Sequence, residues 1–233
     1  MGVSAIIAAA GEGVRFGAAM PKQFLPLGGH PLLAWSIAVM SRSPLIDEIV
    51  LVSGAIHEGS VRKLAASYAG DKTVKVIHGG ATRQESVRAG LSAVAKDIKW
   101  VAVHDAARPF VTTDLLEGVY LLAKEIGAAI PAVPINDTVK ETDDNRFILR
   151  TIDRSRLYIA QTPQVCKRLD LVRAFEEAQR LRFKATDEAS LLEFIGVDVG
   201  LAEGSAFNIK VTFPYDLRLA EAIITSSLTS FYI

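Results

Sequence analysis

The sequence contains little cysteine, lacks long apolar runs and has no surplus of charge of either sign. Its 233 residues include one cysteine, Cys166. A disulfide within the chain and a zinc site built from several cysteines are therefore excluded, and we interpret Cys166 as an incidental thiol. Lysine and arginine together number 26, as do aspartate and glutamate. This balance does not indicate a nucleic-acid polymer as a partner.

A membrane partner is not indicated either. No apolar segment reaches the roughly 20 residues that a membrane span requires, and the N-terminus lacks a charged segment followed by a long apolar stretch. We therefore expect a cytoplasmic protein. Half of its residues are hydrophobic, which is sufficient for a large buried core.

Short apolar runs typical of buried strands alternate with stretches whose apolar residues recur at helical spacing. The expected strands are residues 3–9, 48–53, 74–77, 100–104 and 128–133. The expected helices between them are residues 31–41, 60–68, 83–95 and 114–126. We expect Thr113 to cap the last of these helices and Gly127 to end it. The alternation predicts a Rossmann-like α/β fold, in which helices cover both faces of a mostly parallel, twisted sheet.

This alternation breaks at residues 136–154, where two polar, alternating segments flank Asp143-Asp144-Asn145. The pattern predicts a β-hairpin. Because the hairpin is sparsely hydrophobic, we expect it to project as an arm that needs a partner surface for support. After the arm we expect helices at 169–182 and 187–194, a strand at 197–202 and a helix from Pro214. No linker or repeat divides the sequence, so residues 1–233 are predicted to form one domain.

A glycine-rich segment follows the first expected strand. Gly11 and Gly13 permit a ligand to approach the backbone closely, and successive N–H groups in such a loop can surround phosphate oxygens. A dinucleotide-binding loop would require an acid at the end of the second strand, which is instead Leu-Val-Ser-Gly at 51–54. A Walker loop would require Gly-Lys-Ser/Thr. Arg15 and Lys22 add two cations, which favours a phosphate site over a structural turn.

The residues of this loop resemble the signature loop of sugar-nucleotidyltransferases. The resemblance rests on Ala9-Ala10-Gly11, Gly13, Arg15 and Pro21-Lys22-Gln23-Phe24-Leu25. Further matching motifs follow in order at residues 79–87, 103–110, 136–140, 161–164, 186–189 and 208–212. Together they make most of the chain similar to the 2-C-methyl-D-erythritol 4-phosphate cytidylyltransferase family. The resemblance implies the nucleotide-diphospho-sugar transferase fold and transfer of CMP from CTP to 2-C-methyl-D-erythritol 4-phosphate, with release of pyrophosphate.

This reaction needs positive charge more than it needs a general base. The attacking phosphate oxygen is already ionised, whereas a triphosphate and a second phosphate repel each other. Positioning and cationic stabilisation should therefore carry catalysis. The resemblance implies that Arg15, Lys22 and Lys210 supply this charge. Lys210 lies in the apolar run 207–211, where an unpaired ammonium would be costly.

Asp105 follows a predicted buried strand, at the edge where α/β sheets bind ligands. Magnesium is usually held by one or two carboxylates with phosphate oxygens and water. The resemblance assigns Asp105 to Mg²⁺ or another divalent cation, and the alternative is that Asp105 caps the next turn. Arg108 could pair with a substrate phosphate or with Asp105, and we favour the substrate. We expect His104 to be structural.

The resemblance also implies the remaining contacts. Those expected to bind CTP are Ala9, Ala10, Gly11, Gly13, Gly80, Ala81, Ser86 and Asp105. The arms of two subunits are expected to interlock in a homodimer, so that Thr138 and Arg154 bind the polyol phosphate held by the partner. Thr186 is expected to contact the polyol and could also cap the following helix. The alternative for Thr138 and Arg154 is ordinary strand-edge polarity.

Three other functions compete with this interpretation. Ribitol-5-phosphate cytidylyltransferases share its chemistry but typically have Gly-Gly in the first loop and His-Asp-Ser-Val-Arg after the fourth strand. This chain has Ala10-Gly11 and, at residues 104–108, His-Asp-Ala-Ala-Arg. A non-catalytic nucleotide sensor would be expected to lose a cation or Asp105, and neither is lost. A nicotinamide dehydrogenase is disfavoured by the missing ribose-binding acid.

Overall fold

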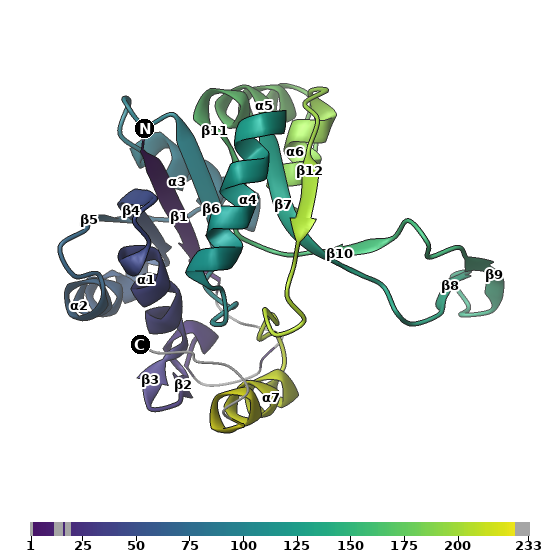
Figure 1. Ribbon diagram of the computed structural model, residues 1–233, viewed down its shortest axis with the longest axis horizontal. Coiled ribbons are helices and arrows are strands. Elements are labelled where there is room, and N and C mark those ends of the chain that lie inside the picture. The colour runs from purple at the N-terminus through teal and green to yellow at the C-terminus, as the bar shows by residue number, and fades with distance from the viewer. Residues whose placement is uncertain (1, 12–15, 17–19, 227–233) are drawn as a thin grey trace.

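A central sheet of eight strands organises the chain, for which a computed structural model describes residues 2–11, 16 and 20–226 (Figure 1). The strands lie in the order β10 (Tyr158–Ala160), β7 (Ala128–Pro134), β11 (Gln164–Lys167), β6 (Trp100–Asp105), β1 (Val3–Ala9), β4 (Ile46–Ser53), β5 (Thr73–His78), and β12 (Gly200–Glu203) pairs with β7. The pairs among β6, β1, β4 and β5 are parallel, as is β7 with β12. Strands β10 and β11 run antiparallel to their neighbours.

The predicted mostly parallel sheet is confirmed. The antiparallel strands β10 and β11 were not anticipated, because three or four residues are too few to establish a period. The strand expected at 197–202 begins only at Gly200. Cys166 of β11 is buried as a free thiol. No helix among the residues that the structure describes has both the length and the apolar character needed to span a membrane.

Helices cover both faces of the sheet, as predicted. Helices α1 (Leu32–Arg42), α2 (Glu58–Tyr68) and α4 (Thr113–Ile126) pack on one face. Helices α3 (Arg83–Ala93), α5 (Arg168–Arg180) and α6 (Glu188–Phe194) pack on the other. Successive side chains of β1 alternate between the two cores: Ile7 joins the first and Ile6 the second. Because both faces are covered at the centre of the sheet, β1 is almost continuously apolar and buried.

A third, smaller core lies under the loops at one edge of the sheet. Leu27 and Leu32 pack with Phe110, Val211 and residues of α7 (Pro214–Thr225). Two short strands, β2 (Pro26–Leu27) and β3 (His30–Pro31), and the single-turn helices η2 (Lys22–Phe24) and η3 (Ala55–His57) belong to the same end of the molecule. Pro214 is the first residue of α7, as predicted.

The hairpin predicted for the arm is present and projects from the body of the molecule (Figure 1). It pairs β8 (Val139–Thr142) with β9 (Ile148–Ile152). The second strand begins two residues later than expected, because the Asp143 carboxylate accepts the N–H groups of Asn145 and Phe147 and so lengthens the turn. The side chain of Phe147 is 71% exposed. The role of the arm in dimerisation stays a prediction.

Two predicted helix caps were wrong by one residue. Thr112, not Thr113, caps α4, and its hydroxyl accepts the N–H of Leu115. Asp187, not Thr186, caps α6, and its carboxylate accepts the N–H of Ser190. In both cases the residue with extended backbone lies where its side chain meets the first free N–H groups of the helix. Gly127 ends α4 at a φ of 118°, as predicted.

Close packing between α3 and the sheet depends on Gly90. A Cβ there would lie 2.6 Å from Cγ2 of Ile6 and 2.9 Å from Cγ2 of Val52, whereas a Cβ at Gly118 of α4 would have no atom within 4 Å. We expect Gly90→Ala to lower the free energy of unfolding by about 1–3 kcal/mol through overpacking. Gly118→Ala should raise it by up to about 1 kcal/mol through helix propensity. Urea unfolding of both variants measures this, and equal effects would contradict the packing argument.

Candidate active site

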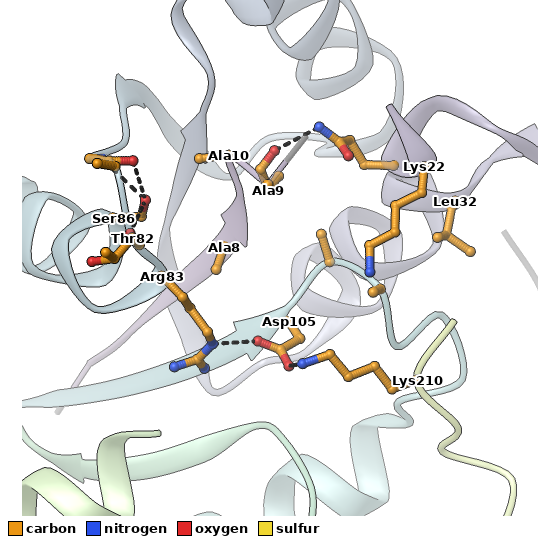
Figure 2. Close-up of a pocket in the computed structure, with 16 residues that line it drawn as sticks. Ala8, Ala9, Ala10, Lys22, Leu32, Thr82, Arg83, Ser86, Asp105 and Lys210 are labelled. Carbon is orange, nitrogen blue, oxygen red and sulfur yellow. Dashed lines mark hydrogen bonds and ion pairs between the residues drawn. The ribbon is translucent and has the colours of Figure 1, made fainter. Parts of the chain in front are cut away.

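A cavity of about 490 Å³ opens where β1 and β6 end (Figure 2). The parallel register places Ala8 of β1 beside Asp105 of β6, and Ala9 beside Ser53 of β4. The loops that follow β1, β5 and β6 therefore meet at one edge of the sheet. The predicted site residues that line the cavity are Ala9, Ala10, Gly11, Lys22, Gly80, Ala81, Ser86, Asp105 and Lys210. Gly13 and Arg15 lie outside the described residues.

The loop before α3 is held close against the end of β1. A Cβ on Gly79 would lie 2.6 Å from Cβ of Ala10 and 2.7 Å from Oγ of Ser86, so only glycine fits there. The Ser86 hydroxyl donates to the carbonyl of Thr82 at 2.8 Å and accepts the N–H of Gly80 at 3.1 Å. Ser86 thus shapes the 80–82 loop, and its expected contact with cytosine stays a prediction.

Gln23 fixes the end of β1 from the other side. Its buried side-chain amide donates to the carbonyl of Ala9 at 2.9 Å. Gln23 belongs to the motif at residues 21–25, but its sequence position alone does not indicate this contact. A buried amide that completes a backbone hydrogen bond keeps the strand end in one conformation. The backbone expected to face the nucleotide is therefore held from both of its neighbouring loops.

Asp105 lies between two cations. Its Oδ1 accepts from Nε of Arg83 at 2.9 Å, and its Oδ2 accepts from Nζ of Lys210 at 2.6 Å (Figure 2). Burial opposes ionisation of this carboxyl, but the charges of Arg83 and Lys210 outweigh it and hold the pKa of Asp105 well below its usual range. The backbone carbonyl of Asp105 accepts the N–H of Arg108, so the main chain closes the next turn. The Asp105 side chain lines the cavity as a carboxylate.

Arg83 is itself anchored by a second carboxylate, which the sequence analysis did not identify. Its two Nη atoms donate to Oε1 and Oε2 of Glu188 at 2.8 and 2.9 Å. Glu188 is 1% exposed, and this burial raises its pKa while the charge of Arg83 opposes the rise. Both residues stand in motifs already quoted. The ion pair between Arg83 and Glu188, which are 105 residues apart, could not be predicted from the sequence, because no local sequence pattern indicates it.

Two lysines that are far apart in the sequence line the same cavity. Nζ of Lys22 donates at 2.9 Å to the carbonyl of Val211, which is the residue that follows Lys210 in the sequence. Figure 2 shows both ammonium groups on the side of the cavity near Asp105. Lys22, Lys210 and Asp105 thus line one cavity, and their roles stay predictions. Such a cluster favours binding of polyanions.

His104 lies behind Asp105 and is completely buried. Its Nε2 lies 3.1 Å from the carbonyl of Arg108, and its Nδ1 lies 2.9 Å from Oγ1 of Thr162. Thr162 in turn accepts the N–H of Asp105 at 3.1 Å. Burial lowers the pKa of His104 to about 4. A neutral ring that donates from Nε2 and accepts at Nδ1 satisfies every one of these groups, so His104 and Thr162 fix the backbone of Asp105.

The residues expected to bind the second substrate do not line this cavity in the part of the chain that is described. Arg108 is buried and donates to the carbonyls of Asn208 and Ala160, at 2.7 and 3.3 Å. Thr138 and Arg154 are exposed at the base of the arm, and Thr186 is exposed just before α6. Because the arm extends away from the sheet (Figure 1), it does not bring its residues to the cavity of its own chain. Their roles stay predictions.

Comparison with known proteins gives consistent results along nearly the whole chain. A model of the 2-C-methyl-D-erythritol 4-phosphate cytidylyltransferase family matches residues 3–226. The enzyme of that name from Symbiobacterium thermophilum is 45% identical over 95% of this chain and 92% of its own length. That from Aromatoleum aromaticum is 43% identical over 95% of each chain.

A solved structure agrees with these sequence matches. The 4-diphosphocytidyl-2C-methyl-D-erythritol synthase of Anaerococcus prevotii superposes with a TM-score of 0.85 and 31% identity. The match covers 96% of this chain and 98% of that one. The shared fold therefore extends over almost the whole chain.

Neutral His104 should make stability depend on pH in a defined window. The folded-state pKa of about 4 lies below the ordinary value of 6.5, so between these values the unfolded chain binds a proton that the folded chain does not. The free energy of unfolding should therefore fall as pH falls from 6.5 towards 4, by roughly 3 kcal/mol in total. Urea unfolding of the wild type and His104→Gln across this range measures the contribution. An identical pH dependence in both proteins would contradict it.

Proposed function

The chain belongs to the 2-C-methyl-D-erythritol 4-phosphate cytidylyltransferase family, and from this premise we propose that it forms 4-diphosphocytidyl-2-C-methyl-D-erythritol and pyrophosphate from CTP and 2-C-methyl-D-erythritol 4-phosphate. The observation that carries the proposal is the convergence of Asp105, Lys22 and Lys210 on a cavity bounded by glycine- and alanine-rich backbone. That arrangement offers N–H groups and cations together, which is what a triphosphate requires.

The residues of the cavity would bind and orient rather than exchange protons. The backbone at Ala9–Gly11 and Gly80–Ala81 would hold CTP, with the base contacted by groups of the loop that Ser86 shapes. Lys22 and Lys210, joined by Arg15, would stabilise negative charge as a phosphate oxygen of the polyol attacks the α-phosphorus in line and pyrophosphate leaves. The attacking oxygen is already ionised, so no general base is needed. His104 is buried behind Asp105 and is not required as one.

The donor set at Asp105 fits a divalent cation that is shared with the nucleotide. Within the described residues no group of three or more His, Cys, Asp or Glu side chains could hold a metal alone. One carboxylate together with phosphate oxygens and water is the usual environment of Mg²⁺. When bound there, the ion would neutralise charge on the triphosphate. Asp105 would hold it, and Lys22 and Lys210 would contact the same phosphates.

The second substrate would be bound with the help of a partner subunit. The arm exposes Phe147, Ile148 and Leu149 at its tip, and exposed apolar side chains in a group mark an interaction site. We infer a homodimer in which the arms interlock, so that Thr138 and Arg154 of one chain face the cavity of the other. Thr186 and Arg108 would complete the polyol phosphate site.

Both substrates are anions that do not cross bilayers, which supports a cytoplasmic location.

A pyrophosphate-release assay tests the reaction. With CTP and Mg²⁺, we expect turnover of 2-C-methyl-D-erythritol 4-phosphate and little of ribitol 5-phosphate, because residues 104–108 and the first loop match the former class. Turnover of ribitol 5-phosphate alone would overturn the substrate. Turnover of neither would overturn the assignment as an enzyme, provided that the protein is folded.

Mixing two impaired variants tests the shared site. Lys22→Ala and Arg154→Met should each lower turnover about 100-fold or more. If the arms are exchanged, mixed dimers place both lesions in one site and leave the other intact, and mixing should restore roughly a quarter of wild-type activity. Lys22→Ala mixed with Lys210→Met is the matched control. These lesions lie in the same site of each chain, so every site stays impaired. Failure of the first mixture to recover would exclude arm exchange.

A further inference from the structure

The two cations on Asp105 are held in different ways. Arg83 makes three hydrogen bonds with the two carboxylates, one to Asp105 and two to Glu188. Its backbone is also fixed, because it is the first residue of α3 and follows the capping box that Thr82 forms with Glu85. The Lys210 ammonium bonds only Oδ2 of Asp105 among the described residues, and the Lys210 side chain, which lines the cavity, is 36% exposed.

This difference determines which of the two cations can leave Asp105 at the lower cost in free energy. A divalent cation at Asp105 would compete with a cation already bonded to each of its two oxygens, because Oδ1 accepts from Arg83 and Oδ2 from Lys210. Moving Arg83 away would leave Glu188 buried without its counter-charge, which is strongly destabilising. Moving Lys210 away leaves its ammonium in a cavity that would then contain phosphate oxygens. Release of Lys210 is therefore the less costly step.

We propose that Arg83, anchored by Glu188, is a positioning residue that fixes Asp105 through Oδ1, while the bond from Lys210 to Oδ2 is the one that a metal–nucleotide complex replaces. The inference deepens the proposed function and rests on it. Arg83 acts on the reaction through Asp105. Lys210 changes partner, from the carboxylate to the phosphates.

We call the arrangement of Arg83 with Asp105 and Glu188 the clamp. Because of the position of Arg83 in the fold, the clamp also contacts segments beyond Asp105. Arg83 follows the 80–82 loop, which is expected to contact the nucleotide. Through Glu188 it reaches the first turn of α6, two residues after Thr186. One guanidinium thus ties together the nucleotide loop, the carboxylate of β6 and the segment expected to contact the polyol. The planar fork of arginine can bond both acids at once, whereas the single ammonium of lysine cannot reproduce that geometry.

Calorimetry of CTP binding tests the clamp without relying on turnover. The affinity for CTP is measured in EDTA and in Mg²⁺ for the wild type, Arg83→Gln, Arg83→Lys and Glu188→Gln. We expect the Mg²⁺-dependent gain in affinity to shrink about 10-fold or more in all three variants, with the affinity in EDTA unchanged. Arg88→Gln is the matched control, because Arg88 lies on the same helix and bonds Gln179 at the surface. It should behave as the wild type.

Steady-state kinetics with both substrates then separates positioning from folding. The three variants should show kcat lowered about 10- to 100-fold and a KM for CTP in Mg²⁺ that rises with the weaker metal-dependent binding, and Arg83→Lys should not rescue kcat. An unchanged or larger Mg²⁺-dependent gain in a folded variant would overturn the clamp, as would a loss of CTP affinity in EDTA. If Arg83→Gln does not fold, Arg83→Lys and Glu188→Gln decide the question. Failure of the proposed function is separate, because it would appear as absence of turnover in the wild type.

Discussion

The pairing of the Asp105 carboxylate with Arg83 and Lys210 is the interaction on which the site depends. A buried carboxylate is stable as an ion only when cations compensate the loss of hydration. Here the cations come from the start of α3 and from the segment before α7, so the two halves of the chain meet at one side chain. The Thr162–His104 pair fixes the backbone of the same residue from behind. Position and charge at the sheet edge are thus determined together.

The chain as a whole carries no formal net charge, yet among the described residues that line its cavity Lys22, Arg83 and Lys210 accompany the Asp105 carboxylate. This local excess explains why the overall composition is uninformative about binding to a polyanion. A polymer requires an extended basic surface, whereas one triphosphate requires a few cations at a concave point. The overall composition did not indicate the first class of partner, whereas the glycine-rich loop with its cations and the arrangement of the cavity indicate the second.

Much of this arrangement could be predicted from the sequence. Runs such as Ile49–Val52 indicate strands because they are buried on both faces, and the positions of Asp105 and of the glycine loop at strand ends follow from the α/β alternation. The short strands β10 and β11 could not be predicted, because their residues have no repeating pattern and depend on pairing with β6 and β7. The caps at Thr112 and Asp187 were missed by one residue, since adjacent polar residues compete for the same N–H groups.

The contacts between residues that are distant in sequence could not be predicted either, because no local pattern indicates them. Neither Arg83 nor Glu188 has a neighbour in sequence that shows its partner, and family resemblance named their motifs without connecting them. The buried position of Arg108 was equally invisible, because an arginine after a strand is as compatible with a ligand as with backbone carbonyls. Propensity and period describe local structure, whereas ion pairs across the fold are set by which loops the topology brings together.

The bond from Lys22 to the carbonyl of Val211 joins residues 189 positions apart, and this has a consequence during synthesis. Domains form from the N-terminus as the ribosome extends the chain. Lys22 is made early, but Val211, whose carbonyl it bonds, is made 189 residues later. An incomplete chain therefore has the recognisable loop without a finished nucleotide pocket. The contact that positions Lys22 therefore forms only after Val211 has been synthesised.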